Sequence, residues 1–291
     1  MKLLFDIGGT KLRRGVLNDR GEFVLLDDRL SKGDLKAKLE ALIAETIKRY
    51  PIDFIGASFA GQTQNNRLFF APNIELGALK NEDFSDWIFD RFSIKAAIDN
   101  DLKCAAIAEA AARSTTRTLF ALFVGTGIGG ACVENGAIGR GANNNAGEIG
   151  HIPFEKTPFL CGCGGADCLE ASASGSAIAK WSERYGFQAR TIAELSNLDN
   201  PKAAEILDRF HRGIDYAVRT IIALFNPDTI VLGGGVALSC ESALIRAKNA
   251  AQNAFKPSRR VTIELSSLGD KANLLGAALL DADLSKPKTT R

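Results

Sequence analysis

Two segments of the chain share one pattern: an apolar strand, a glycine turn and a second strand. The first is KLLFDIGGTKLRRGVL, residues 2–17, and the second is TLFALFVGTGIGGACVENG, residues 118–136. Apolar residues on both sides of a tight glycine turn are typical of two antiparallel strands joined as a hairpin. The chain has 291 residues, a length that suits about two domains, so the repeat predicts two related lobes.

Further strands and helices are predicted between and after the two hairpins. Residues 35–47 repeat leucine and isoleucine at helical spacing behind Asp34, a suitable N-cap. IDFIGASF and SIKAAIDND predict strands, the second running into a helix, LKCAAIAEAAAR. A long helix is expected over residues 201–225, then a strand with a third glycine turn, TIVLGGGVA. The last seven residues, SKPKTTR, lack periodicity and are expected to be disordered.

Composition argues against nucleic-acid and membrane partners. Lys and Arg number 36 against 34 Asp and Glu, a formal charge of +2, too small to favour a polyanionic partner. The longest uncharged run, residues 118–133, contains four glycines and is shorter than the roughly 18 apolar residues of a membrane helix. Only three apolar residues separate Lys2 from Asp6, too few for a secretory signal. A cytoplasmic protein is therefore expected.

Three of the six cysteines cluster in one loop, and one of the two histidines lies just before them. Cys161, Cys163 and Cys168, with His151, match the donor set of a tetrahedral Cys3His zinc site. Four protein ligands leave no position for water or substrate, so the zinc is predicted to be structural. Free thiols or a disulfide are the alternatives, and a disulfide is rare in a reducing compartment.

The glycine turns are candidate phosphate sites, because backbone amides can approach a phosphate where no side chain intervenes. The Walker pattern is absent. Gly125, Gly127 and Gly130 satisfy the dinucleotide pattern G-x-G-x-x-G, but a strand is expected after them where that motif needs a helix, so an NAD enzyme is the weaker alternative. Asp6, directly before the first turn, suits a water-mediated Mg2+ site; the alternative is a turn aspartate bonded to its own backbone.

Asn100 and Asp101 lie where a predicted strand passes into a helix. Ligands of open α/β sheets bind at such carboxyl ends of strands, and a carboxylate there can accept the proton of an attacking hydroxyl. The alternative is that Asp101 serves only as the helix N-cap. His211, on an amphipathic helical segment, is given no role.

Six motifs in order, DIGGTK, NDLKCAAIAE, GTGIGG, AGEIGH, CGCGGADCLE and IVLGGGVA, resemble those of the ROK family of sugar kinases and repressors over nearly the whole chain. The resemblance implies an α/β, two-lobed actin-like ATPase (ribonuclease H-like) fold with a nucleotide cleft between the lobes. The expected domains are an N-terminal lobe, residues 1–113, and a C-terminal lobe, residues 114–291, with the last helix packing back on the N-terminal lobe.

The resemblance also implies roles for particular residues. Asp101 matches the catalytic base. The residues that match sugar-binding positions are Gly61, Asn73, Asn100, Asp101, Glu148, His151 and Glu170. Those assigned to ATP and Mg2+ are Asp6, Gly8, Gly9, Thr10, Lys11, Gly125, Thr126, Gly127, Gly129, Gly130, Gly233, Gly234 and Gly235. His151 is expected to use one ring nitrogen for zinc and the other for a sugar hydroxyl.

The chain departs from the family pattern at three places. Lys103 stands in the last place of the usual Asn-Asp-Ala-Asn. Asp167 replaces the glycine before the third cysteine, and Phe59-Ala60 replaces Pro-Gly.

The leading functional hypothesis is ATP-dependent phosphorylation of a hexose, most simply glucose to glucose 6-phosphate. Alternatives are another sugar, such as N-acetylmannosamine or fructose, another phosphate donor, such as polyphosphate, or a dinucleotide oxidoreductase. A sugar-responsive DNA-binding regulator is also possible, but the first glycine turn at Gly8 leaves no space before it for a helix-turn-helix domain. A homodimer is expected.

Overall fold

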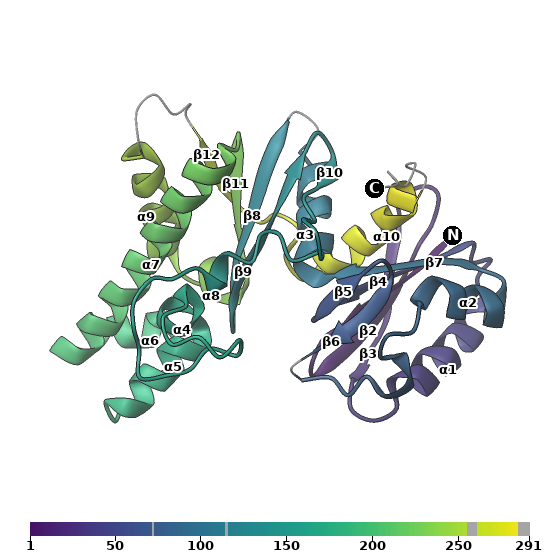
Figure 1. Ribbon diagram of the computed structural model, residues 1–291, viewed down its shortest axis with the longest axis horizontal. Coiled ribbons are helices and arrows are strands. Elements are labelled where there is room, and N and C mark those ends of the chain that lie inside the picture. The colour runs from purple at the N-terminus through teal and green to yellow at the C-terminus, as the bar shows by residue number, and fades with distance from the viewer. Residues whose placement is uncertain (72, 114–115, 255–260, 285–291) are drawn as a thin grey trace. The chain divides into compact units, whose positions relative to one another are not determined.

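The computed structural model describes residues 1–71, 73–113, 116–254 and 261–284 (Figure 1). The chain divides into two compact units. Unit 1 contains Met1–Ala108, Gly141–Asn145 and the described part of Asp270–Arg291, and unit 2 contains Glu109–Arg140 and Ala146–Gly269. The predicted domain boundary after residue 113, like the predicted disordered tail at 285–291, falls on residues outside this description.

Unit 1 is built on a five-stranded sheet in the order β3-β2-β1-β4-β7. The strands are β1 (Lys2–Ile7), β2 (Lys11–Leu17), β3 (Phe23–Leu30), β4 (Phe54–Phe59) and β7 (Lys95–Asn100). The first three are antiparallel, and β1, β4 and β7 are parallel. The predicted first hairpin is thus confirmed.

Helices cover both faces of this sheet. Leu3, Phe5 and Ile7 of β1 pack in one buried cluster with α1 (Leu35–Ile47) and α2 (Phe84–Phe92). On the other face, apolar residues of β1, β4 and β7 pack against α3 (Asp101–Ala111) and α10 (Ala272–Leu284). The alternation of β1 side chains between two buried faces explains why its sequence is nearly all apolar.

Unit 2 repeats the same plan. Its sheet has the order β10-β9-β8-β11-β12, with β8 (Thr118–Val124), β9 (Ile128–Glu134), β10 (Ala137–Ile138), β11 (Thr229–Gly233) and β12 (Thr262–Leu265). Counted from its first strand, each sheet is ordered 3-2-1-4-5, antiparallel for three strands and parallel for the rest. The two lobes inferred from the repeated hairpin are therefore related in topology.

The helices of unit 2 pack on the face that carries Phe120, Leu122 and Val124. They are α4 (Leu169–Ala173), α5 (Gly175–Arg184), α6 (Ile192–Ser196), α7 (Pro201–Phe225), α8 (Gly235–Leu238) and α9 (Glu241–Gln252). The remaining short elements of the chain are β5 (Gln62–Gln64), β6 (Arg67–Phe70), η1 (Gly77–Leu79), η2 (Ile149–His151) and η3 (Gly269–Lys271).

Helix α7 has the limits that the sequence predicted. Pro201 occupies its first turn, and the Asn200 side chain accepts a hydrogen bond from the backbone N of Lys202, so the N-terminus is capped. Asn226 ends the helix in the left-handed conformation, with φ of 42°.

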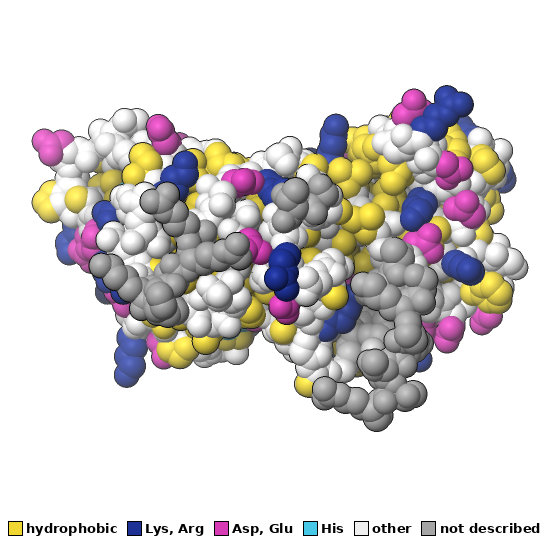
Figure 2. Space-filling model, turned by 90° about the horizontal axis from the view of Figure 1, so that it is seen from above, with side chains coloured by type: hydrophobic (Ala, Val, Ile, Leu, Met, Phe, Trp, Pro, Cys, Tyr) yellow, Lys and Arg dark blue, Asp and Glu magenta, His cyan; other side chains and the backbone are white. Residues whose placement is uncertain are grey.

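No helix within the described ranges is long and apolar enough to cross a membrane. Figure 2 shows Lys and Arg side chains interspersed with Asp and Glu over the face seen from above. This mixture agrees with the small net charge of the chain.

Candidate active site and metal centre

The first glycine turn joins β1 to β2 and follows Asp6 directly. Gly8 N donates to Lys11 O at 2.9 Å, which closes the turn. A Cβ at Gly9 would lie 2.8 Å from Asn73 Cβ, so only glycine fits beside this exposed asparagine. The turn therefore brings two predicted site positions together. Lys11 is exposed, with its Nζ 3.0 Å from Asp28 Oδ2.

Asp6 is buried and has three partners in unit 1. Its Oδ2 lies 3.1 Å from Arg13 Nη2, the residue opposite it in the β1–β2 register. Its Oδ1 accepts hydrogen bonds from Ser58 Oγ and Asn273 Nδ2, both at 3.2 Å. Burial raises the pKa of Asp6 above its ordinary value, against the lowering effect of Arg13 and of these hydrogen bonds. Since these contacts engage both oxygens, Asp6 fits a water-mediated contact to Mg2+ better than direct ligation.

Asn100 and Asp101 occupy the junction of β7 and α3, at the carboxyl end of a parallel strand. Asn100 Oδ1 accepts from the backbone N of Leu102 and Lys103 at 3.1 and 3.2 Å, as an N-cap does. Asn100 thus occupies the N-cap position, and Asp101 Oδ1 also accepts from Leu102 N, at 2.9 Å. Asp101 is the first helical residue, where the helix dipole favours its ionised form.

The Asn100 amide nitrogen links the pair to the predicted sugar-binding position Gly61. Asn100 Nδ2 donates to Gly61 O at 3.2 Å and to Asp101 Oδ1 at 3.0 Å. A Cβ at Gly61 would lie 2.4 Å from both Phe59 Cε1 and Phe70 O, so the site requires glycine there. Phe59 fills the space beside Gly61 and is fully buried.

The second and third glycine turns converge in unit 2. Gly125 N donates to Gly127 O at 2.9 Å, and Gly125 O accepts from Gly175 N, the first residue of α5, at 2.8 Å. A Cβ at Gly234, whose φ is +85°, would lie 2.5 Å from Val124 O. The chain continues after Gly127 as β9, so the helix that a Rossmann dinucleotide site requires does not follow this motif.

The predicted metal ligands come together in unit 2. One donor atom each from His151, Cys161, Cys163 and Cys168 lie within 4.8 Å of one another. His151 Nδ1 is 3.5 Å from Cys161 Sγ, and the sulfurs of Cys163 and Cys168 are 3.4 Å apart. Four donors of this kind in one compact group fit a tetrahedral zinc site.

The cysteines of this group differ in surroundings. Burial raises the pKa of Cys161 to about 12 and also raises that of Cys168. The pKa of exposed Cys163 is lowered, first by its hydrogen bond with the backbone of Gly165. Cation binding would favour the thiolate form at all three.

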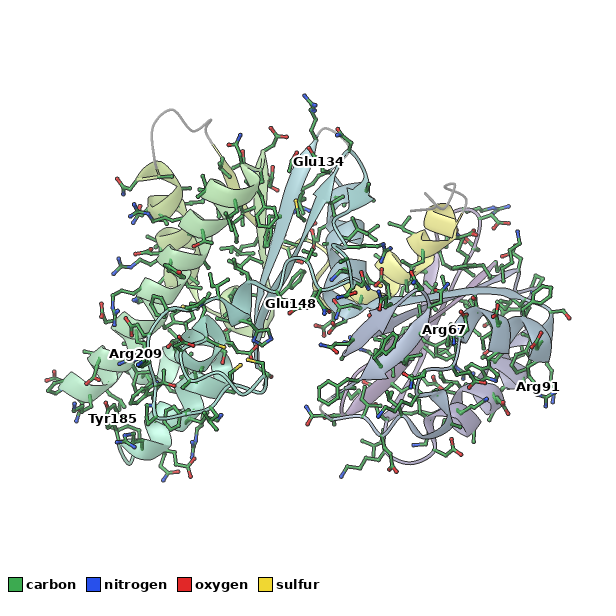
Figure 3. The ribbon with its side chains drawn as sticks, in the orientation of Figure 1. Arg67, Arg91, Glu134, Glu148, Tyr185 and Arg209 are labelled. Carbon is green, nitrogen blue, oxygen red and sulfur yellow. The ribbon has the colours of Figure 1, made fainter. Side chains whose placement is uncertain are left out.

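Glu170 and Glu148 flank the metal group. Glu170, in the first turn of α4, accepts from Ile128 N at 2.9 Å through Oε2, and its Oε1 lies 3.4 Å from Cys161 Sγ. A Cβ at Gly127 would come within 2.3 Å of Glu170 Oε2. Glu170 thus links the second glycine turn to the cysteine loop. Glu148, labelled in Figure 3, directly precedes η2, which ends at His151. His151 N donates to Glu148 O at 3.1 Å, so one turn joins the two residues.

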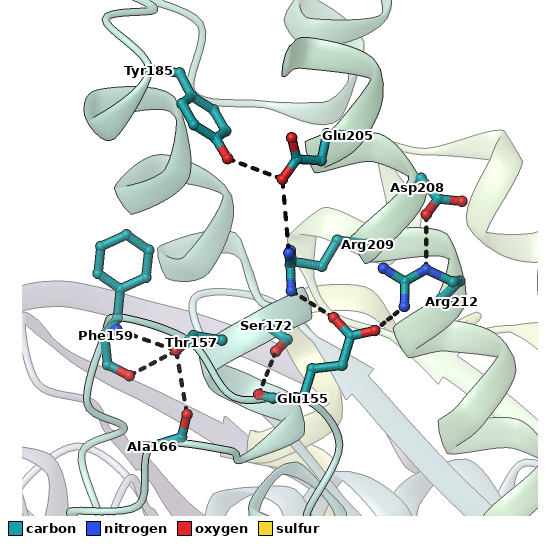
Figure 4. Close-up of polar contacts among 10 residues, drawn as sticks. All are labelled: Glu155, Thr157, Phe159, Ala166, Ser172, Tyr185, Glu205, Asp208, Arg209 and Arg212. Carbon is teal, nitrogen blue, oxygen red and sulfur yellow. Dashed lines mark hydrogen bonds and ion pairs between the residues drawn. The ribbon is translucent and has the colours of Figure 1, made fainter. Parts of the chain in front are cut away.

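An ion-pair network fastens the metal loop to α7 (Figure 4). Glu155 accepts from Arg209 at 2.5 Å and also pairs with Arg212. Arg209 lies over the Trp181 ring at 4.7 Å from the ring centre. The network thus joins α5 and α7 to the loop between His151 and Cys161.

Several residues of these sites were not predicted from the sequence. They are Arg13, Ser58 and Asn273 around Asp6, and Thr63, Asp99 and Asn144 beside Asn100. Hairpin register could have indicated Arg13, since it lies opposite Asp6. Asp99 directly precedes Asn100 in sequence, whereas Ser58, Asn273, Thr63 and Asn144 come from distant segments and carry no local signal.

Together, two units of one strand order, each with a glycine turn after its first strand, constitute the two-lobed actin-like ATPase fold. A model of the ROK family matches residues 3–283, and the chain belongs to this family. The predicted fold class and family are thereby confirmed.

Individual relatives are sugar kinases. The chain is 29% identical over 286 residues to an N-acetylmannosamine kinase of Yersinia pseudotuberculosis, covering 95% of this chain and 97% of the relative. Among solved structures, the ROK hexokinase of Thermus thermophilus matches with a TM-score of 0.79 and 27% identity, over 97% of this chain and 99% of that one. A ROK glucokinase of Streptomyces griseus, in complex with glucose and AMPPNP, matches with a TM-score of 0.75 and 24% identity, over 96% and 98%. These relatives agree with the enzyme class predicted from the sequence.

Proposed function

We propose that this protein is an ATP-dependent sugar kinase in which Asp101 is the general base. The observation that carries this proposal is the place of Asp101, a carboxylate at the carboxyl end of β7 and the start of α3. A carboxylate so placed can take the proton of a sugar hydroxyl as that oxygen attacks the γ-phosphorus of ATP. The bond between the γ-phosphorus and the bridging oxygen breaks, and ADP leaves.

The remaining residues bind and orient the two substrates. The amides of the turns at Gly8-Gly9 and Gly125–Gly130 are proposed to bind phosphate oxygens, with Gly233–Gly235 beside the adenosine. Magnesium, when bound with ATP near Asp6, would offset phosphate charge. Asn73, Glu148, His151 and Glu170 are proposed to bind sugar hydroxyls.

The proposed role of zinc is structural. The four ligands hold the loop that runs from His151 to Cys168 and thereby orient the adjacent carboxylate Glu170. A closed tetrahedral site of this kind supplies folding energy and no open coordination position.

Glucose and N-acetylmannosamine are the two main candidate substrates. Glucose was expected from the sequence, and the hexokinase and glucokinase relatives support it. The N-acetylmannosamine kinases among the relatives support that amino sugar as a second candidate. They differ at carbon 2, in the substituent and in its orientation, so selectivity would come from the groups around that carbon.

A coupled ADP-release assay with Mg-ATP tests the proposal across glucose, N-acetylmannosamine, fructose and N-acetylglucosamine. We expect sugar-dependent ADP release and its loss by roughly 100-fold or more in Asp101→Asn. Asp90→Asn, an exposed position on α2, is the matched control and should keep full activity. No ADP release with any sugar, or normal turnover in Asp101→Asn, would refute the proposed function.

A further inference from the structure

A buried polar cluster lies directly behind the Asn100–Asp101 pair. Asp99, Thr63 and Asn144 are 2%, 2% and 8% exposed. Asn144 Nδ2 donates to Asp99 Oδ1 at 2.7 Å, and Thr63 Oγ1 donates to the same oxygen at 3.2 Å. Asn144 Nδ2 is also 3.0 Å from Thr63 O. These contacts link a carboxylate of β7, a residue of β5 and a residue from a distant part of the chain.

Asn144 comes from a segment that belongs to unit 1 although its neighbours in sequence do not. Residues Gly141–Asn145 are part of unit 1, while the chain before and after them belongs to unit 2. Within the segment Asn144 is the buried residue, and its φ is +60°, a left-handed conformation that asparagine tolerates. The backbone is thus shaped to insert this side chain beside Asp99.

Asp99 Oδ1 links the cluster to the proposed sugar site. Asp99 Oδ1, which accepts from Asn144 and Thr63, also accepts from Asn100 N at 2.8 Å. The same Asn100 caps α3 and bonds to Asp101 Oδ1. A change in the position of the Asp99 carboxylate would therefore shift the residue on which the proposed base depends.

We propose that Asn144, with Thr63, is a positioning residue for the sugar site: it fixes the Asp99 carboxylate, which in turn orients Asn100 and Asp101. The inference rests on the proposed function, because it takes Asn100 and Asp101 as the groups that meet the sugar. Losing one buried hydrogen bond to a carboxylate corresponds to roughly a ten- to hundredfold effect.

Asn144→Gly removes the side chain and keeps the left-handed backbone, and Asn145→Gly at the adjacent exposed residue is its matched control. We expect Asn144→Gly to lower kcat/KM for the sugar by roughly ten- to hundredfold, with a raised KM. The affinity for a fluorescent ATP analogue should stay unchanged. A role in folding alone would lower the active fraction, and so kcat, without raising KM.

Thr63 provides a second test that does not alter the segment Gly141–Asn145. Thr63→Val removes the hydroxyl donor at nearly constant volume, and Thr63→Ser restores it. We expect the valine variant to show the same sugar-specific loss and the serine variant to recover it. Losses in Asn144→Gly and Thr63→Val should combine less than additively, since both act through one carboxylate oxygen.

The outcomes separate this inference from the proposed function. Normal turnover in Asp101→Asn would defeat the proposed function itself. An inactive Asp101→Asn together with equal sugar kinetics in Asn144→Gly and Asn145→Gly would overturn only the positioning role. Equal loss of sugar and nucleotide affinity in Asn144→Gly would overturn it as well.

Discussion

Asp6 is a buried carboxylate that forms an ion pair with one arginine, Arg13. Its neighbours Arg13, Ser58 and Asn273 come from three different elements. Burial nevertheless outweighs them, so the pKa of Asp6 is raised. A buried carboxyl whose pKa is raised by desolvation and that also has a charged partner is typical of a functional site.

Asp6→Asn should therefore leave the free energy of unfolding at pH 7 equal to or above that of wild type. The raised folded-state pKa means that ionised Asp6 lowers stability above that pKa. This penalty disappears as the pH falls through the folded-state value toward the ordinary value of 3.8. The difference in the free energy of unfolding between Asp6→Asn and wild type should become smaller as the pH falls through this range.

Urea unfolding of both proteins between pH 7 and pH 4 measures this difference, with Asp90→Asn as the exposed control. A variant that is clearly less stable than wild type at pH 7 would show that the Arg13 pair outweighs burial. Nucleotide affinity measured on the same samples should fall in Asp6→Asn, as expected for a group that acts in binding.

At the scale of elements, the metal loop shows what spacing can and cannot predict. The ligand set His151, Cys161, Cys163 and Cys168 was identified from residue type and spacing, and the structure brings the four together. The ion pairs of Glu155 with Arg209 and Arg212 were not predicted. Its partners lie more than fifty residues away, on a helix whose rotation depends on packing.

We expect one zinc ion per chain and its loss in Cys163→Ser. Since zinc binding to a structural site contributes folding free energy, the variant should unfold more easily, by roughly 2 kcal/mol or more. Its KM for the sugar should rise, because Glu170 lies beside the ligand Cys161.

Cys132→Ser is the control for the metal experiment. Burial raises the pKa of Cys132 to about 11, and it lies outside the metal group, so this variant should retain zinc. Metal content by mass spectrometry and unfolding with and without a chelator give the result. A zinc-free wild type with full stability and activity would contradict the structural role.

For the whole molecule, the repeated hairpin predicted two related lobes, and the strand orders agree with it. Local signals also placed α1, α7 and the β7–α3 junction, because caps and periodicity act over a few residues. The strand β3 and the β5–β6 pair were not predicted. Their charged or short sequences carry little alternation, and pairing with neighbours determines them. Residues 141–145 belong to unit 1 although their neighbours in sequence do not. This placement depends on long-range contacts such as that of Asn144 with Asp99, so it was not predicted either.

The last helix, α10, covers one face of the sheet that contains the first strand, β1. Helix α10 packs on β1, β4 and β7, and its approach is so close that backbone meets backbone. A Cβ at Gly276 would lie 1.8 Å from Cys104 O of α3, and a Cβ at Gly56 of β4 would lie 2.2 Å from Ala277 O. Two glycines on facing elements therefore set the distance at which the last helix covers the sheet.

Gly276→Ala should destabilise the protein by roughly 3 kcal/mol, because rigid backbone on α3 blocks the added methyl group. Alanine favours a helix more than glycine does, so propensity alone predicts the opposite sign. Gly235→Ala, where a Cβ meets nothing within 4 Å, is the control and should change stability little. Chemical unfolding curves of the three proteins decide between the two signs. A Gly276→Ala variant as stable as wild type would mean that α10 can move away from α3. The packing of α10 in unit 1 would then tolerate a larger distance between the two helices.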